Sequence, residues 1–259
     1  MLNFQNVFSE LIILNPNHSF MKTNYAILAL LLAAIFQSCT ANFNSKSENQ
    51  VIDEQAVDGA SKLKISGIFN LYLSQGDQPT LKIEGDEELV QKLKVTRDGE
   101  WLELDFEKVN ENFFKKNSKL NVFLTLSELE EFVFDGVGNI KTEGSFEVED
   151  ISIKGDGVGN LNLELQANSI KAVFSMLGNI NLSGRVASID LSNDGLGNVD
   201  ASKLIAQNMN LKSSGIGRVA VHCEGDLSII VDGIGTVSYE GNPNVIKEKI
   251  NGIGKVTRN

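Results

Sequence analysis

The pair His222-Cys223 is the strongest candidate for covalent catalysis in the sequence. A thiolate beside an imidazolium is an activated nucleophile. Both residues lie in the alternating segment V-A-V-H-C-E, which is typical of a β-strand, and consecutive residues of a strand point to opposite faces. We therefore expect no dyad between them: Cys223 should be a small buried residue and His222 a surface residue.

Four aspartates precede glycine motifs and would offer oxygen ligands to Ca²⁺ if they stacked along one edge. They are Asp135, Asp156, Asp194 and Asp232. Calcium-binding nonapeptide repeats, however, have half this spacing and keep an acid after the glycines, where this chain has asparagine. Other residues also interrupt the column, namely Ser175, Ser214 and Asn251. We expect exposed turn residues and no metal site, with weak calcium binding as the alternative.

Glycoside cleavage is the enzymatic alternative, because β-helices host it and the chain is rich in carboxylates. The exported part has few aromatic residues for sugar stacking: Tyr72, Trp101 and Tyr239. The glycine pairs do not indicate phosphate loops, since no strand-to-helix context and no Lys-Ser/Thr follows them. Two His and two Cys are also too few for a zinc or iron–sulfur centre. The sequence therefore predicts no catalytic residue, no cofactor and no enzyme.

Seven blocks of about 20 residues contain or adjoin His222, Cys223 and the four aspartates. They open G-V-G-N-I, G-V-G-N-L, M-L-G-N-I, G-L-G-N-V, G-I-G-R-V, G-I-G-T-V and G-I-G-K-V. The second glycines are Gly138, Gly159, Gly178, Gly197, Gly217, Gly235 and Gly254, spaced by 21, 19, 19, 20, 18 and 19 residues. So regular a period predicts a solenoid, in which each unit buries its apolar face by stacking on its neighbours.

The residues around the glycines indicate that the solenoid is built from β-strands. Each block has an aliphatic residue between its glycine positions and another two positions after the second glycine, as in Val137 and Ile140. This pattern predicts a strand at each motif with its aliphatic side chains inward. No block holds the roughly 10 to 12 residues of helical periodicity that a packed helix needs. We therefore predict an all-β solenoid with Gly-x-Gly turns.

Glycine and asparagine recur at fixed positions of these turns. Glycine adopts positive φ without a Cβ penalty, and because the first position is Met176 in one block, we expect the second to be the more strained. Asparagine follows the second glycine in four consecutive blocks, at Asn139, Asn160, Asn179 and Asn198. Stacked about 4.8 Å apart, these amides are expected to form a hydrogen-bonded ladder, structural or ligand-binding, that ends at Arg218.

Residues 57–134 lack the repeat but keep the alternation of apolar and polar residues that is typical of β-strands, as in K-L-K-I and W-L-E-L-D-F. Only D-E-E-L-V-Q-K-L at residues 86–93 indicates a short helix, with acids in its first turn. No linker rich in Pro, Gly or Ser separates this half from residues 135–259. We therefore expect irregular β coils and an N-terminal cap that belong to the same domain as the regular repeats.

Residues 1–38 indicate a signal peptide. The apolar run at residues 26–36 is too short to span a bilayer but fits the core of a secretory signal, and Met21 with its following lysine is the expected start. The sequence F-Q-S-C ending at Cys39 resembles the lipobox of bacterial lipoproteins, so Cys39 is the expected lipid attachment site. Ordinary signal cleavage and a disulfide to Cys223 are the alternatives. Polar residues 39–56 should form a flexible tether.

The acidic balance of the chain restricts its partners. Lys and Arg number 23 against 34 Asp and Glu, which gives a net charge of −11. A nucleic acid would be repelled over most of the molecule. The expected partners are a membrane, reached through the lipid anchor, and an extracellular or envelope polymer or protein.

Three segments resemble the head GIN domain family (DUF2807), proposed auto-transporter adhesins of Gram-negative bacteria. They are I-S-G-I-F-N-L-Y-L-S-Q-G, L-K-I-E-G-D-E-E-L-V-Q-K-L, and the closing G-x-G turns that end in E-G-N-P-N-V. The resemblance covers residues 57–259. It implies a two-sheeted right-handed parallel β-helix and a role in surface adhesion, and it supplies no catalytic residues. Combined with the lipobox, it leads us to expect a lipoprotein of the Gram-negative outer membrane.

Overall fold

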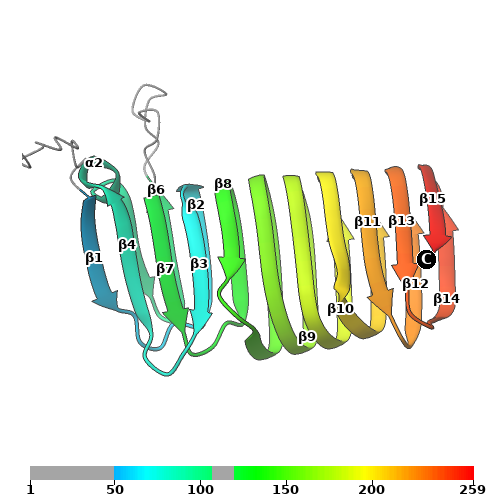
Figure 1. Ribbon diagram of the computed structural model, residues 1–259, viewed down its shortest axis with the longest axis horizontal. Coiled ribbons are helices and arrows are strands. Elements are labelled where there is room, and N and C mark those ends of the chain that lie inside the picture. Colours follow the sequence, from blue (N-terminus) through cyan, green and yellow to red (C-terminus); the bar gives the residue numbers. More distant parts are fainter. Residues whose placement is uncertain (1–49, 107–119) are drawn as a thin grey trace, which may run out of the picture. The chain divides into compact units, whose positions relative to one another are not determined.

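The computed structural model describes residues 50–106 and 120–259, which form a β-solenoid of about six turns (Figure 1). The predicted all-β solenoid is confirmed. The predicted signal peptide, the start at Met21, the lipid site Cys39 and residues 39–49 of the tether lie outside the described residues. In the part that is described, no helix is long and apolar enough to cross a membrane.

The C-terminal coils repeat in space as they repeat in sequence. Their strands are β8 (Glu131–Thr142), β9 (Phe146–Asn193), β10 (Leu196–Ser213), β11 (Ile216–Cys223), β12 (Asp226–Val231), β13 (Ile234–Glu240), β14 (Asn244–Ile250) and β15 (Ile253–Arg258). The coils pair in parallel, and the register places equivalent block positions together, as with Gly138 on Gly159 and Gly217 on Gly235. β9 is one 48-residue element because its extended backbone continues through successive bends.

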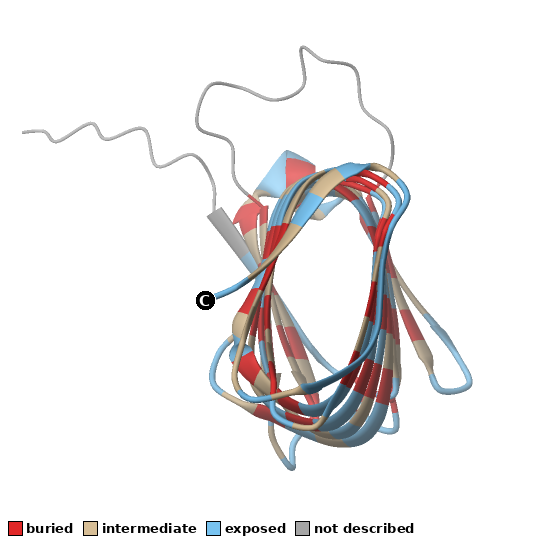
Figure 2. Cartoon of the chain, turned by 90° about the vertical axis from the view of Figure 1, so that its right-hand side faces the viewer, coloured by how far each residue is buried: buried red, intermediate tan, exposed pale blue. Residues whose placement is uncertain are grey.

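The aliphatic residue two positions after the second glycine closes the core in the first six blocks, as predicted, whereas Val256 of the last block is only partly buried. The residues two positions after the second glycine are at most 2% exposed: Ile140, Leu161, Ile180, Val199, Val219 and Val237. Seen along the solenoid axis, buried residues recur on both long walls of the coils and alternate with exposed ones (Figure 2). The alternation follows from the extended backbone, in which successive side chains point to opposite faces.

The aliphatic residues between the glycine positions do not face the core, contrary to the prediction. Val137 is 44% exposed and Leu196 is 48% exposed, and the equivalent residues of the other coils are exposed too. Val137 and Ile140 are three residues apart, so an extended chain turns them to opposite faces. We call this exposed row the aliphatic ridge. It comprises Ile68, Val137, Val158, Leu177, Leu196, Ile216, Ile234 and Ile253.

Close stacking of the bends explains the second glycine of each motif. At Gly178 φ is +146°, and a Cβ would lie 1.9 Å from the carbonyl oxygen of Gly159 in the preceding coil. At five more glycines an added Cβ would lie 1.7–1.9 Å from a backbone carbonyl oxygen of the preceding coil: Gly138, Gly159, Gly197, Gly217 and Gly235. Gly254, in the last coil, differs, because the nearest atom there would be the side-chain Cγ1 of Val231 at 2.7 Å.

The second glycine position is the more strained one, as predicted, because it combines positive φ with the closest backbone oxygen, whereas among the first glycines only Gly157 has positive φ. The first position is nevertheless closely approached. A Cβ on Gly195 would lie 2.1 Å from the carbonyl oxygen of Met176. Met176 itself is only 3% exposed, and a Cβ on the buried Gly155 would lie 3.0 Å from its Sδ. Met176 is therefore a core residue, accommodated by the missing side chain at Gly155, and not a sign of a relaxed turn.

The N-terminal half does not add coils in sequence order. β2 (Lys62–Ile68) and β3 (Asn70–Gln75) form a coil that pairs in parallel with β8. On their other side they pair in parallel with β6 (Trp101–Phe106) and β7 (Leu120–Leu126), which come later in the chain. The coil of β2 and β3 is thus enclosed on both sides, and the chain passes over it to reach β8.

Antiparallel strands form the predicted N-terminal cap. β4 (Thr80–Asp86) pairs with β7, and β5 (Leu93–Asp98) pairs with β6. The single-turn helix α2 (Glu87–Val90) follows β4 and buries Leu89. It is shorter than the helix predicted over residues 86–93, because Leu93 already begins β5.

Residues 50–56 correct the predicted tether. They form the edge strand β1 (Gln50–Ala56), which pairs antiparallel with β4 and sets Glu54 opposite Lys82. Residues 52–56 are all exposed, so no apolar face marks the strand in the sequence. Backbone pairing and opposite charges hold it to β4, and polar side chains on an edge strand discourage further pairing.

Candidate functional site

Three columns of side chains share the outer face of the glycine bends. Residues 135, 137 and 139 are separated by glycines, so their side chains project together, and the register repeats the arrangement in the next coil. The aliphatic ridge runs between the other two columns. The acid column contains Asp135, Asp156, Ser175, Asp194, Ser214, Asp232 and Asn251. The amide column contains Asn139, Asn160, Asn179 and Asn198. We call this surface the three-column face.

The amide column is a continuous hydrogen-bonded ladder. Each Nδ2 donates to Oδ1 of the preceding coil: Asn160 to Asn139 at 2.8 Å, Asn179 to Asn160 at 3.0 Å, and Asn198 to Asn179 at 3.2 Å. The column of asparagines ends where Arg218 pairs with Asn198. All bonds run in one direction, so every amide is held in the same orientation with its second N–H directed elsewhere.

Sequence reasoning missed two members of this ladder. Asn139 Nδ2 donates to Asn70 Oδ1 at 3.0 Å, and Asn70 Nδ2 donates to Asn121 Oδ1 at 3.1 Å. A signal for Asn70 was present, since S-G-I-F-N repeats the block with Phe69 at the second glycine position. Asn121 carries no such signal, and it joins the ladder only because β7 lies beside β3.

An open groove of about 800 Å³ runs beside the ladder. Its floor includes a second polar row, in which Asn181 Nδ2 donates to Asn162 Oδ1 at 2.6 Å. Asp200 continues that row and accepts hydrogen bonds from the hydroxyl and the backbone N–H of Ser202, at 2.6 and 3.0 Å. These bonds lower the pKa of the Asp200 carboxyl and stabilise its charged form in the groove.

The acid column does not assemble a metal centre. Across residues 50–106 and 120–259, no three His, Cys, Asp or Glu side chains converge as ligands. Asp232 instead accepts a hydrogen bond from Asn251 Nδ2 at 2.6 Å, in the next coil. Both residues are exposed, which is how turn residues were predicted to lie.

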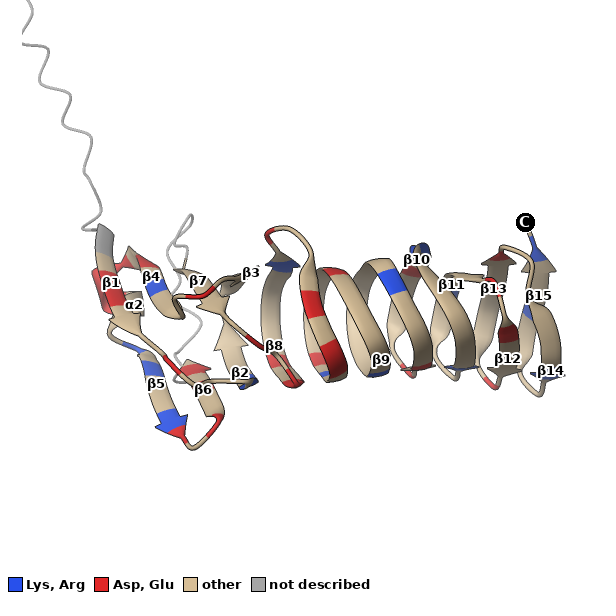
Figure 3. Ribbon diagram, turned by 90° about the horizontal axis from the view of Figure 1, so that it is seen from below, with Lys and Arg blue, Asp and Glu red and all other residues tan. Residues whose placement is uncertain are grey.

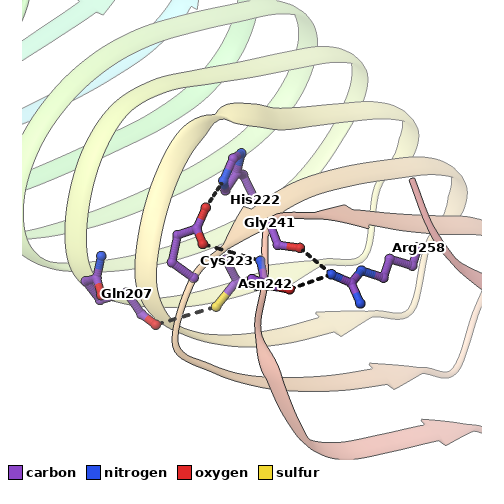
Figure 4. A network of polar contacts seen from close by, with 7 residues as sticks. Gln207, His222, Cys223, Gly241, Asn242 and Arg258 are labelled. Carbon is purple, nitrogen blue, oxygen red and sulfur yellow. Dashed lines mark hydrogen bonds and ion pairs between the residues drawn. The ribbon is translucent and has the colours of Figure 1, made fainter.

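His222 and Cys223 point to opposite faces of β11 (Figure 4). Cys223 is fully buried, with Sγ 3.5 Å from the Asp226 carbonyl oxygen, and burial raises the pKa of its thiol. His222 Nε2 lies 2.7 Å from Glu224 Oε1, a contact that lowers the pKa of the Glu224 carboxyl. The histidine therefore takes part in a hydrogen bond with Glu224 on the outer face, and the thiol is not activated as a nucleophile.

The second bend of the coils forms a larger open depression of about 1320 Å³. Its acidic residues are Glu128, Glu130, Glu147, Glu149 and Asp150. Figure 3 shows acidic residues gathered around β8 and the beginning of β9. All five are exposed, whereas the general acid of a glycosidase lies in an apolar pocket that holds its proton. The ring of Tyr72 is also engaged elsewhere, because it stacks on Phe123 with 4.7 Å between the ring centroids.

Three solved structures share the fold at low sequence identity. A "putative adhesin" from Bacteroides fragilis is 22% identical with a TM-score of 0.76, and the match covers 82% of this chain and 98% of that one. A "putative adhesin" from Parabacteroides merdae is 20% identical with a TM-score of 0.59, covering 81% and 96%. A "putative lipid binding protein" from Parabacteroides distasonis is 19% identical with a TM-score of 0.62, covering 82% and 97%.

No curated protein matches the chain. The family model described as "Putative auto-transporter adhesin, head GIN domain" (DUF2807) matches residues 60–243. The match spans the N-terminal cap, the enclosed coil of β2 and β3, and the regular coils as far as β13. It therefore includes most of the aliphatic ridge and the whole amide ladder. The chain belongs to the head GIN domain family.

Proposed function

We propose that the protein is a binding module of the bacterial cell envelope, an adhesin-like domain without catalytic activity that holds a polymer or protein partner on its three-column face. The aliphatic ridge carries this proposal. Eight large aliphatic side chains, 41 to 77% exposed, lie in one row along the solenoid. The core does not use them, and a contiguous exposed apolar surface of this size is typical of an interaction site.

The two polar columns add selectivity to the ridge. The amide ladder fixes its donors and acceptors before a partner arrives, so little conformational entropy is lost on binding. The acid column gives the opposite flank a negative charge. The same three chemistries recur from coil to coil, so a long partner would make many weak contacts that add together.

Binding without turnover is the expected result when the exported chain meets a panel of envelope glycans, host glycans, matrix proteins and its own immobilised copies. Retention should be saturable, and no new reducing ends should appear. The triple variant Leu177→Thr, Leu196→Thr, Ile216→Thr should reduce retention at least about tenfold, because it removes apolar surface while keeping β-propensity.

The matched control is Val173→Thr, which changes an exposed aliphatic residue outside the ridge. Equal retention by the triple variant and this control would show that the ridge is not the binding surface. Product formation abolished by a single Asp or Glu substitution would assign the protein to the carbohydrate-active enzymes instead.

We further propose that the domain is exported and anchored in the outer membrane through lipid on Cys39. Support comes from the apolar run before F-Q-S-C and from the family, whose description as an auto-transporter adhesin suggests a surface- or envelope-associated protein. Labelled palmitate should enter the wild-type protein, and Cys39→Ser should abolish labelling because the acylated thiol is absent. Cys223→Ser, which removes the buried thiol, is the control and should label normally. Equal labelling of the wild type and Cys39→Ser would refute the anchor.

A further inference from the structure

We propose that the partner of the three-column face is the same face of a second copy of this chain, in a side-by-side dimer with parallel solenoid axes. This inference rests on the proposed function, since it names the occupant of the surface proposed there. In this dimer the two aliphatic ridges meet along a two-fold axis that runs parallel to them. Each ridge residue then packs on its own counterpart, coil against coil.

The order of the columns makes the face self-complementary in this arrangement. Rotation about an axis along the ridge exchanges the two flanks, so the acid column of one copy meets the amide column of the other. Asp156 then faces the partner's Asn160, Asp194 the partner's Asn198, Asp232 the partner's Thr236 and Ser214 the partner's Arg218. Every carboxylate meets a donor, and Arg218 meets an acceptor.

The antiparallel arrangement lacks this complementarity. Rotation about an axis across the ridge would set the acid column of one copy on the acid column of the other. With all eight rows overlapping, Asp135 of each copy would face Asp232 of the other, and like charges held opposite each other are destabilising. The charge pattern therefore selects the parallel dimer, in which both chains enter from the β1 end and are compatible with anchorage in one membrane.

The face is large enough for a specific contact. The ridge crosses eight coils spaced by about 4.8 Å, and the face takes in five consecutive residues of each coil, with a rise of about 3.3 Å per residue. The face is therefore about 38 Å long and 16 Å wide. Two such surfaces bury roughly 1,200 Å² together, at the lower end of the range for stable protein interfaces. The coils stack regularly along the whole solenoid (Figure 1), so the ridge is continuous from one coil to the next.

Site-directed cross-linking in the membranes of expressing cells tests the dimer and its direction. The full chain is made with one added cysteine, in the variants Val137→Cys, Leu196→Cys and Ile234→Cys, and treated with a short bismaleimide. In the parallel dimer all three should give covalent dimers, because each position faces itself. The control Val173→Cys and the wild type, which carries only Cys39 and Cys223, should remain monomeric.

Two outcomes would overturn the proposal. Absence of dimer with all three ridge variants would exclude self-association through the face. Dimers formed only when Val137→Cys and Ile234→Cys are mixed would show an antiparallel pair. If the ridge variants fail to cross-link while the threonine triple variant still loses retention on a foreign ligand, the proposed function stands and the dimer does not.

Charge substitution next to the ridge gives a second readout. In the Leu196→Cys background, Asn198→Lys places a cation against the partner's Asp194 and should raise the cross-linked fraction severalfold. Asn198→Asp places a second carboxylate there and should lower it severalfold. Both changes remove the same last rung of the ladder, so their difference reports charge alone. Equal yields from the two variants would contradict the facing of acid and amide columns.

Discussion

Replacing Gly178 by alanine should lower the free energy of unfolding by about 4 kcal/mol, since steric overlap and backbone strain add at this position. The new Cβ would lie 1.9 Å from the carbonyl oxygen of Gly159, and the residue would keep a φ of +146° that disfavours any side chain. Neither coil can shift alone, because Gly197 stacks on Gly178 in the same way from the other side. Denaturant unfolding followed by circular dichroism measures the change.

Leu177→Ala is the matched control for this substitution. It alters the adjacent residue, whose side chain is 48% exposed and contributes little to the core, so the expected change is below about 1 kcal/mol. Equal losses for the two variants would mean that the bend tolerates a Cβ and that the stacking distance is wrong. A large loss for Leu177→Ala alone would mean that the ridge is part of the core.

Met176→Ala should cost about 3 kcal/mol, because it empties a buried volume. The prediction tests how Met176 and Gly155 share one space in the core. Gly155→Ala should cost about 1 kcal/mol on its own, since its Cβ would come within 3.0 Å of Met176 Sδ and of Phe174 Cδ1. In the double variant the new Cβ occupies part of the vacated space, so the combined loss should be smaller than the sum by about 1 kcal/mol.

A double-mutant cycle of unfolding free energies measures this coupling. Ser175→Ala combined with Gly155→Ala is the control cycle, because Ser175 is exposed next to Met176 and its change should simply add. Strict additivity in the Met176 cycle would show that the methionine does not fill the gap at Gly155.

The solenoid and much of its turn chemistry could be predicted from the sequence because they depend on neighbours one period away. Every block has a second glycine, and four consecutive blocks have asparagine after it. The regular spacing of these residues therefore predicts both the stacking of the bends and the ladder. The ridge was misassigned for the opposite reason. Hydrophobic type alone suggested an inward side chain at Val137, whereas the three-residue offset from Ile140 decides the face.

The order of the N-terminal strands could not be predicted, because it depends on pairings between segments that do not repeat. No periodic signal states that β6 and β7 lie outside β2 and β3, and Asn121 is consequently missing from the predicted ladder. Edge strand β1 has no apolar alternation, so its polar residues suggested a tether. Strands held mainly by backbone pairing leave little trace in composition.

The enclosure of β2 and β3 gives folding of this domain a direction. Their strands gain partners on both sides only after β7 and β8 have been synthesised. The coil of β2 and β3 therefore cannot be completed until the chain has reached about residue 142. We expect that non-local closure to be the slow step, because every later coil docks on an edge that already exists. Growth then follows the order of synthesis, from the cap toward β15, each block lengthening the rod by about 4.8 Å. Losing a terminal block would shorten the rod, whereas losing β6 or β7 would remove the nucleus on which all of it is laid down.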